Sequence, residues 1–134
     1  MYIDQLERVQ NKFLRICRYK MGFNRTNCDY NYILCQLNMK TLENRESECE
    51  LRFLHKILNG FVDCPELLEL IVFNVNSRRT RSSDLFRIKF HHTNYGKNET
   101  ITRMMKTANH LQDSVDLFNP SVSAFNNTLK KLRH

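Results

Sequence analysis

The sequence has few glycines and no long apolar run, and each shortage excludes a class of protein. Only 3 of its 134 residues are glycine and each stands alone, whereas a phosphate-binding loop needs several glycines close together. No apolar run approaches the roughly 20 residues that cross a bilayer as a helix. The start, "MYIDQLERVQ", carries acids where a signal peptide has a basic and then an apolar segment. We therefore expect an intracellular protein, in the cytoplasm or the nucleus, with no membrane partner.

Signatures of metal binding and of catalysis are also missing. The five cysteines form no C-x-x-C pair, and an odd number argues against a complete disulfide framework. His91, His92 and His110 lack a spaced partner cluster, so we expect free thiols and no metal site. No G-x-S-x-G, H-E-x-x-H or kinase signature occurs, and no Asp-Asp pair offers the two-metal chemistry of a polymerase. We predict no catalytic residue, no cofactor and no enzymatic activity.

The composition that remains is that of an ordinary globular chain. Hydrophobic residues make up 41% and charged residues 26%, which separates the chain from disordered sequences. A chain of 134 residues has room for one domain with a modest core. We predict a single helical region over residues 1–134, with a helical part at 1–72, a basic arm at 73–97 and C-terminal helices at 98–134.

Basic and acidic residues are segregated along the chain, whose net charge is +7. Residues 1–25 carry six basic and two acidic side chains, and residues 40–69 carry four basic and seven acidic ones. Residues 74–106 carry eight basic and two acidic side chains. Phosphate backbones attract such basic blocks through counterion release. A solvated surface with no particular purpose is the alternative interpretation of any one block.

The segment "QLERVQNKFLRICRYKMG", residues 5–22, has the spacing of an amphipathic helix. At roughly 100° per residue, its apolar side chains share one sector of about 160°. That sector holds Ile3, Leu6, Val9, Phe13, Ile16 and Cys17. The opposite side holds the cations Arg8, Lys12, Arg15 and Arg18. We expect the apolar sector to be buried, the cationic side to face solvent, and Gly22 to end the helix.

Helical spacing recurs through most of the remaining chain, so the fold class is predicted to be mainly α, a bundle of about five helices. A short helix is expected near residues 30–37, and Thr41 can cap the next one, which Gly60 closes. Pro65 suits the first turn of a further helix, and Asn119-Pro120 introduces the last. The apolar stripe of the Thr41-capped helix is predicted on or beside Leu42, Cys49, Phe53, Leu54, Ile57, Leu58 and Phe61.

Residues 73–97 break the helical rhythm. The run Phe86-Arg87-Ile88-Lys89-Phe90 alternates apolar and basic residues, which predicts an extended or short β-like arm. Upstream, "SRRTRSS" has the composition of a loop that wraps an anion. Phe90 and Tyr95 either stack on bases or pack on the core. The arm supplies a second cationic block, formed by Arg78, Arg79, Arg81, Arg87 and Lys89.

The order of several segments resembles a known family. The segments are "LERVQNKFLRI" (6–16), "LNMKTLENR" (37–45), "LRFLHKILNGFVDCPELLELIVFNV" (51–75), "RTRSSDLF" (79–86), "RMMKTAN" (103–109) and "VDLFNPSVSAF" (115–125). In this order they resemble the region downstream of the palm in reverse transcriptases of arthropod non-LTR (LINE-type) retrotransposons. The resemblance covers the chain from about residue 3 to residue 132.

The chain also departs from that family's pattern. Arg45 is followed by Glu46, where the family often has a second arginine. The Tyr/Phe-X-Asp-Asp motif, the upstream endonuclease and any Cys/His knuckle are absent. The resemblance therefore implies a role beside a polymerase core, helping to hold template RNA or the primed DNA target, without polymerase activity in this chain. The missing upstream polymerase region is an implied partner.

These patterns favour a non-catalytic fragment that binds RNA or DNA weakly and without sequence specificity. The nine cations named above would contact phosphates and carry little sequence information. One alternative is a helical protein-interaction scaffold whose basic faces dock on an acidic partner, or on the Glu46–Glu50 face of a second copy. Others are an enzymatic function supplied jointly with missing upstream sequence, and a mobile-element relic without a selected function.

Overall fold

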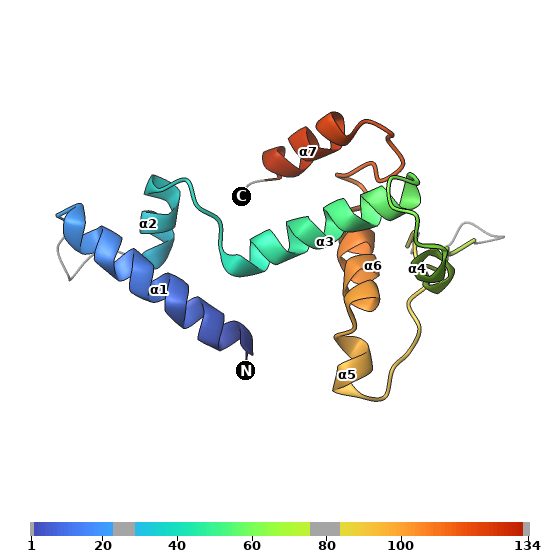
Figure 1. The fold of residues 1–134 in the computed structure, drawn as a ribbon, viewed down its shortest axis with the longest axis horizontal. Helices are drawn as coiled ribbons and strands as arrows, with labels where there is room; N and C mark the ends of the chain where they lie inside the picture. Colours follow the sequence, from blue (N-terminus) through green and yellow to red (C-terminus); the bar gives the residue numbers. More distant parts are fainter. Residues whose placement is uncertain (1, 23–28, 76–83, 133–134) are drawn as a thin grey trace. The chain divides into compact units, whose positions relative to one another are not determined.

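Helices make up most of the chain (Figure 1). The computed structural model describes residues 2–22, 29–75 and 84–132. These ranges contain seven helices: α1 (Tyr2–Lys20), α2 (Tyr30–Gln36), α3 (Leu42–Leu58), α4 (Pro65–Leu70), α5 (Asn94–Lys97), α6 (Thr100–Leu111) and α7 (Val122–Lys131). The prediction of a mainly α fold is confirmed. No helix within those ranges is both long enough and apolar enough to span a membrane.

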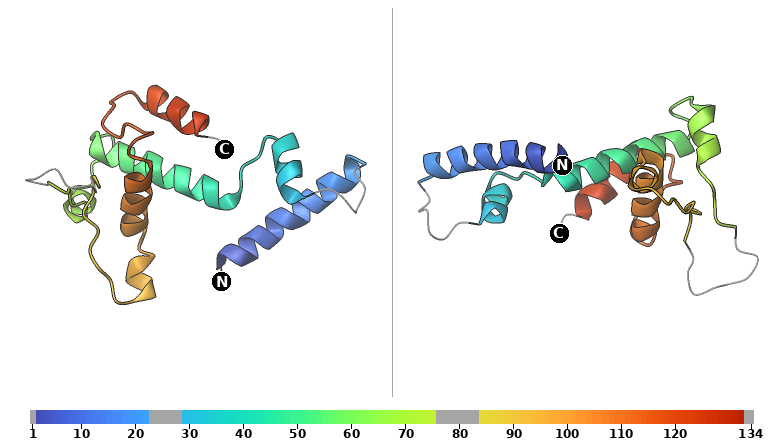
Figure 2. Two further views of the ribbon diagram at one scale, coloured as in Figure 1. Left: turned by 180° about the vertical axis from the view of Figure 1, so that it is seen from behind. Right: turned by 90° about the horizontal axis from the view of Figure 1, so that it is seen from below.

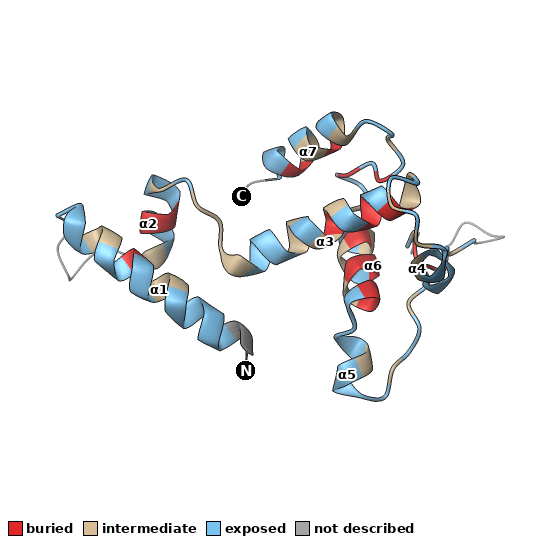
Figure 3. Ribbon diagram, in the orientation of Figure 1, coloured by how far each residue is buried: buried red, intermediate tan, exposed pale blue. Residues whose placement is uncertain are grey.

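Contacts within the chain form two compact units, residues 1–46 and 47–134. Each unit has a core of its own, and the buried residues of both are coloured red in Figure 3. The first unit contains α1, α2 and the start of α3. The second contains the rest of α3 and the other four helices.

The core of the first unit lies between α1 and α2. Leu14 of α1 packs with Ile33 and Leu34 of α2, and all three are buried. The turn after α2 contributes, because Asn38 adopts a left-handed φ of 53° and the Met39 amide donates to the Leu34 carbonyl at 2.8 Å. This geometry is a Schellman motif, which satisfies the last carbonyls of α2 and brings Met39 back onto the core.

The buried face of α1 is not the one that the sequence predicted. Leu14 is only 1% exposed, whereas Leu6, Val9, Phe13 and Ile16 are between 49% and 66% exposed. The predicted burial of these four side chains is therefore wrong. The cause is the partner: α2 has seven residues, and its two buried side chains cover only the sector of α1 around Leu14. Gly22 ends α1 as predicted, with a φ of 72°.

The second unit is built on α3, α6 and α7, with α6 running crosswise to α3 (Figures 1 and 2). Helical spacing explains which side chains meet in the core, because α6 turns one apolar face inward. The connecting segments add buried residues of their own. The core comprises Leu51, Leu54, Ile57, Ile71, Phe86, Ile101, Met104, Met105, Ala108, Val115, Leu117, Phe125 and Leu129.

The ends of α3 agree with the prediction, but its buried face is shifted. The Thr41 hydroxyl accepts a hydrogen bond from the Asn44 amide at 3.3 Å, and Gly60 closes the helix with a φ of 69°. Cys49 and Phe53, predicted on the apolar stripe, are exposed, while Leu51 and His55 are buried. Histidine was not expected inside because its polar ring needs a partner that the sequence alone does not reveal.

That partner is the segment before α7. His55 Nε2 lies 2.7 Å from the Asn119 carbonyl oxygen, and its ring stacks on Phe125 with centroids 4.1 Å apart. Just past the end of α3, the side-chain Nδ2 of Asn59 donates to the Leu117 carbonyl at 3.0 Å. Together these contacts hold the turn that starts α7 against α3, where Ser121 caps α7 by accepting from the Ala124 amide.

The described parts of the predicted arm, residues 73–75 and 84–97, are extended beside α6 at first and helical at the far end. Phe73 and Phe86 form an antiparallel bridge, flanked by hydrogen bonds from the Asn74 amide to the Leu85 carbonyl and from the Arg87 amide to the Val72 carbonyl. Beyond it, α5 lies inside the segment predicted to be extended. A helix of four residues is too short to show the 3.6-residue spacing on which sequence prediction relies.

Candidate nucleic-acid interface

Three of the predicted cations form one exposed strip on α1. Arg8, Lys12 and Arg15 are all exposed, and they lie within about 60° of one another around the helix. Along the helix axis they are separated by about 6 Å and about 4.5 Å. We call these three residues the α1 strip. Arg18 lies further round, toward the face that packs on α2, and is half-buried.

Within the described ranges, Arg8, Lys12 and Arg15 take part in no ion pair. Arg18 and Lys20 lie in the last turn of α1, and Asp4 in the first, so each suits the helix dipole. The dipole acts only near helix ends, so it gives no stabilising role to cations in the middle of the helix. Within the described ranges, neither an ion pair nor the helix dipole therefore accounts for the three positive charges of the α1 strip.

Two acidic residues of α3, Glu48 and Glu50, form ion pairs within the second unit. Glu48 Oε2 lies 3.3 Å from the Arg52 guanidinium, which also donates to Asn126 of α7 at 2.9 Å. Glu50 forms an ion pair with Arg103 of α6. Glu50 thus links α6 to α3, and Arg52, paired with Glu48, links α7 to α3. Arg103 lies 53 residues from Glu50 and Asn126 lies 74 residues from Arg52, so local spacing in the sequence does not predict these contacts.

The second predicted cationic block is described only in part. Arg87 and Lys89 are exposed, while Phe86, which forms the bridge to Phe73, is buried and Ile88 is half-buried. Alternate side chains of an extended chain point to opposite sides, so Arg87 and Lys89 share the outer side. Arg78, Arg79 and Arg81 lie outside the described residues. The α1 strip belongs to the first unit, whereas Arg87 and Lys89 belong to the second.

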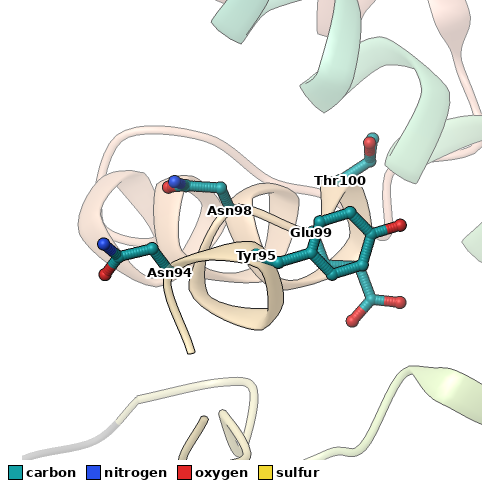
Figure 4. Close-up of a pocket in the computed structure, with 5 residues that line it drawn as sticks. All are labelled: Asn94, Tyr95, Asn98, Glu99 and Thr100. Carbon is teal, nitrogen blue, oxygen red and sulfur yellow. The ribbon is translucent and has the colours of Figure 1, made fainter. Parts of the chain in front are cut away.

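A hollow that the sequence did not indicate lies at the junction of α5 and α6. Its volume is about 400 Å³, and its lining consists of Asn94, Tyr95, Asn98, Glu99 and Thr100 (Figure 4). Thr93 starts α5 by accepting a hydrogen bond from the Gly96 amide at 3.2 Å. Threonine is a favoured N-cap residue, so Thr93 is the sequence feature from which the start of α5 could be predicted.

A larger hollow of about 600 Å³ follows the C-terminal end of α6. Its lining includes Asp113 and Asp116, whose two carboxylates are the chemically notable groups there. Asp116 accepts from the Phe118 amide at 3.0 Å, which is a local turn contact. Among the described residues, no group of three His, Cys, Asp or Glu is placed to hold a metal ion. Cys17, Cys35, Cys49 and Cys64 are free thiols.

Comparison with family models, with curated proteins and with solved structures found no match for this chain. The resemblance to non-LTR reverse transcriptases therefore stays a prediction, based on the segments quoted above.

Proposed function

We propose that the chain is a non-catalytic helical module that binds RNA or DNA through the phosphate backbone, without sequence specificity. The observation that carries the proposal is the α1 strip. Arg8, Lys12 and Arg15 are exposed, adjacent and unused in ion pairs within the described ranges. Arg87 and Lys89, which share the outer side of the arm, add a second basic surface.

Contacts of this kind act through charge, so salt should weaken them. Neutralising Z phosphates gives a plot of log affinity against log salt with a slope of about −0.9Z on duplex DNA and about −0.7Z on single strands. Three strip contacts alone would then account for a slope of about −2 to −3. Phosphate contacts fix position and do not read base identity, so affinity should depend little on sequence.

A matched pair of variants tests the proposal. The strip variant carries Arg8→Gln, Lys12→Gln and Arg15→Gln, and the control carries Lys56→Gln, Lys130→Gln and Lys131→Gln. The control removes the same charge from exposed positions on α3 and α7. Fluorescence anisotropy with a labelled RNA and a labelled DNA, from about 50 to about 200 mM salt, should show a shallower slope for the strip variant only. Equal loss in both variants, or binding by the wild type that ignores salt, would remove the proposal.

The family resemblance supports the same function from another direction. It implies that the parent region helps to hold template RNA or the primed DNA target beside a polymerase. We infer that the missing upstream polymerase region is a partner. Genomic DNA upstream of the first codon should then contain an in-frame Asp-Asp motif, and an upstream frame without one would contradict this part of the proposal.

A second candidate function is protein interaction, favoured by the exposed apolar face of α1. Leu6, Val9, Phe13 and Ile16 follow one another at intervals of three and four residues, which is the spacing of a helix-pairing seam. The α1 strip borders this seam, so the fitting partner is an acidic amphipathic helix. Size-exclusion chromatography at two ionic strengths, alone and with an acidic helical peptide, distinguishes this candidate, because nucleic-acid binding alone predicts no peptide complex.

A further inference from the structure

We propose that the hollow at the α5–α6 junction binds an unstacked base, so that the module holds single-stranded rather than duplex nucleic acid. The inference rests on the proposed function, because it names the form of nucleic acid that the module holds. It concerns a different unit from the α1 strip and depends on aromatic and amide groups instead of charge alone.

Tyr95 is the central residue of this site. Its side chain is 91% exposed on a helix of four residues, so the ring adds nothing to the core of the unit. In Figure 4 the ring points to one side of α5, beside Glu99, and the amide side chains of Asn94 and Asn98 point to the other side; all four residues line the hollow. An aromatic face accepts any base by stacking, and amide groups can both donate to and accept from base edges.

A second aromatic platform lies next to α5. Phe90 is 80% exposed, and its ring meets the His92 ring edge-on with centroids 4.9 Å apart. The residue between them is packed directly on α5, because a Cβ built on Gly96 would lie 2.7 Å from His91 Nδ1. Both platforms therefore belong to one short stretch of the chain, with Phe90 five residues before Tyr95. Bases within a duplex are already stacked on each other, so two such rings are useful to a strand whose bases are unpaired.

The charge around the platforms suits a polyanion. Residues 85–98 contain three Lys or Arg and no Asp or Glu. Lys97 lies on α5, and Lys106 of α6 is close to it, since its ammonium group donates to the Lys97 carbonyl at 3.2 Å. Glu99 is the one acid of the lining, and its oxygens are acceptors for the exocyclic amine of a base and not neighbours for a phosphate.

The experiment compares Tyr95→Ala, Tyr95→Phe and Phe118→Ala. Phe118 is an exposed aromatic residue that follows the opposite end of α6, so it is the matched control. Anisotropy is measured with one labelled strand, as RNA and as DNA, and with its duplex. We expect Tyr95→Ala to weaken single-strand binding about tenfold, with no change for the duplex, while Tyr95→Phe and Phe118→Ala stay near the wild type. A loss with both RNA and DNA supports base stacking, whereas a loss with RNA alone would assign a contact to the 2′-hydroxyl in place of the base and would overturn the inference.

Equal weakening for duplex and single strand, or equal effects of the Tyr95 and Phe118 substitutions, would overturn the inference. A second measurement separates it from the proposed function. The chain has no tryptophan, so Tyr95→Trp places a single indole fluorophore at the site. Free nucleoside monophosphates should quench it by stacking, even if the α1 strip binds nothing. A Trp signal that nucleotides leave unchanged would reject the base site, whatever the oligonucleotide titrations show.

Discussion

Asn109 of α6 bonds both backbone polar groups of Phe86. The Asn109 Oδ1 accepts from the Phe86 amide at 2.8 Å, and its Nδ2 donates to the Phe86 carbonyl at 2.8 Å. The bridge to Phe73 uses the groups of the neighbouring residues, so the amide and carbonyl of Phe86 point away from it. The Asn109 side chain thus forms the two hydrogen bonds that a neighbouring strand would otherwise form with Phe86. Gln112 of the same region bonds the next residue, because its Oε1 accepts from the Leu85 amide at 3.1 Å.

Asn109→Ala should therefore destabilise the second unit strongly. Phe86 is buried, and the substitution leaves its amide and carbonyl without partners, at about 1–3 kcal/mol for each group. We expect a total loss of about 2–4 kcal/mol in urea denaturation. The control is Asn127→Ala at an exposed position of α7, which should change stability by no more than about 0.5 kcal/mol. Similar values for the two variants would show that the bonds to Phe86 do not hold the arm.

Leu14 and Phe13 are neighbours on α1 but lie on different faces, so we expect their substitution to change the stability by different amounts. Leu14 is buried against α2, so Leu14→Ala should cost about 2–4 kcal/mol. Phe13 is the larger side chain but is half exposed, so Phe13→Ala should cost less than about 1 kcal/mol. Thermal unfolding followed by far-ultraviolet circular dichroism compares them. A larger loss at Phe13 would mean that the face predicted from the sequence is the buried one after all.

The sequence predicted where the helices end, but it did not predict which face of α1 is buried. The existence and ends of the helices follow from local chemistry, as at Gly22, Thr41 and Gly60, whose φ values or capping bonds agree with the prediction. The choice of buried face depends on a partner elsewhere in the chain. The apolar residues of α1 cover a wide sector, and the short helix α2 contacts only its edge, around Leu14. The predicted stripe did not contain Leu14.

One part of the candidate interface, the α1 strip, was predictable from the sequence, and the hollow at Tyr95 was not. The periodicity of α1 alone indicates that Arg8, Lys12 and Arg15 share one side, and the structure shows that they are exposed. The hollow at Tyr95 depends on a four-residue helix and on the approach of His91 to Gly96, and neither leaves a periodic signal. Contacts between residues distant in sequence, such as the ion pair of Glu50 with Arg103, could not be predicted from the sequence either.

His55 should stabilise the second unit mainly through its ring. His55→Phe keeps an aromatic surface for Phe125 but leaves the Asn119 carbonyl without its hydrogen bond, which should cost about 1–2 kcal/mol. His55→Ala removes the ring as well and leaves a cavity, so we expect about 3–5 kcal/mol. Urea denaturation of both variants measures the difference. Equal losses would show that the hydrogen bond, and not the stacking, holds the turn before α7.

Gly96 and His91 provide a test of how α5 is held in place. A Cβ at Gly96 would lie 2.7 Å from Nδ1, 2.9 Å from Cγ and 3.0 Å from Cβ of His91, so Gly96→Ala cannot be accommodated by moving the end of a flexible side chain. We expect a loss of about 1–3 kcal/mol from this overpacking. His91→Ala removes the ring and leaves only the Cβ contact at 3.0 Å, so in that background Gly96→Ala should cost less than in the wild type. A double-mutant cycle by urea denaturation gives the coupling directly. Independent effects of the two substitutions would mean that His91 does not pack on α5.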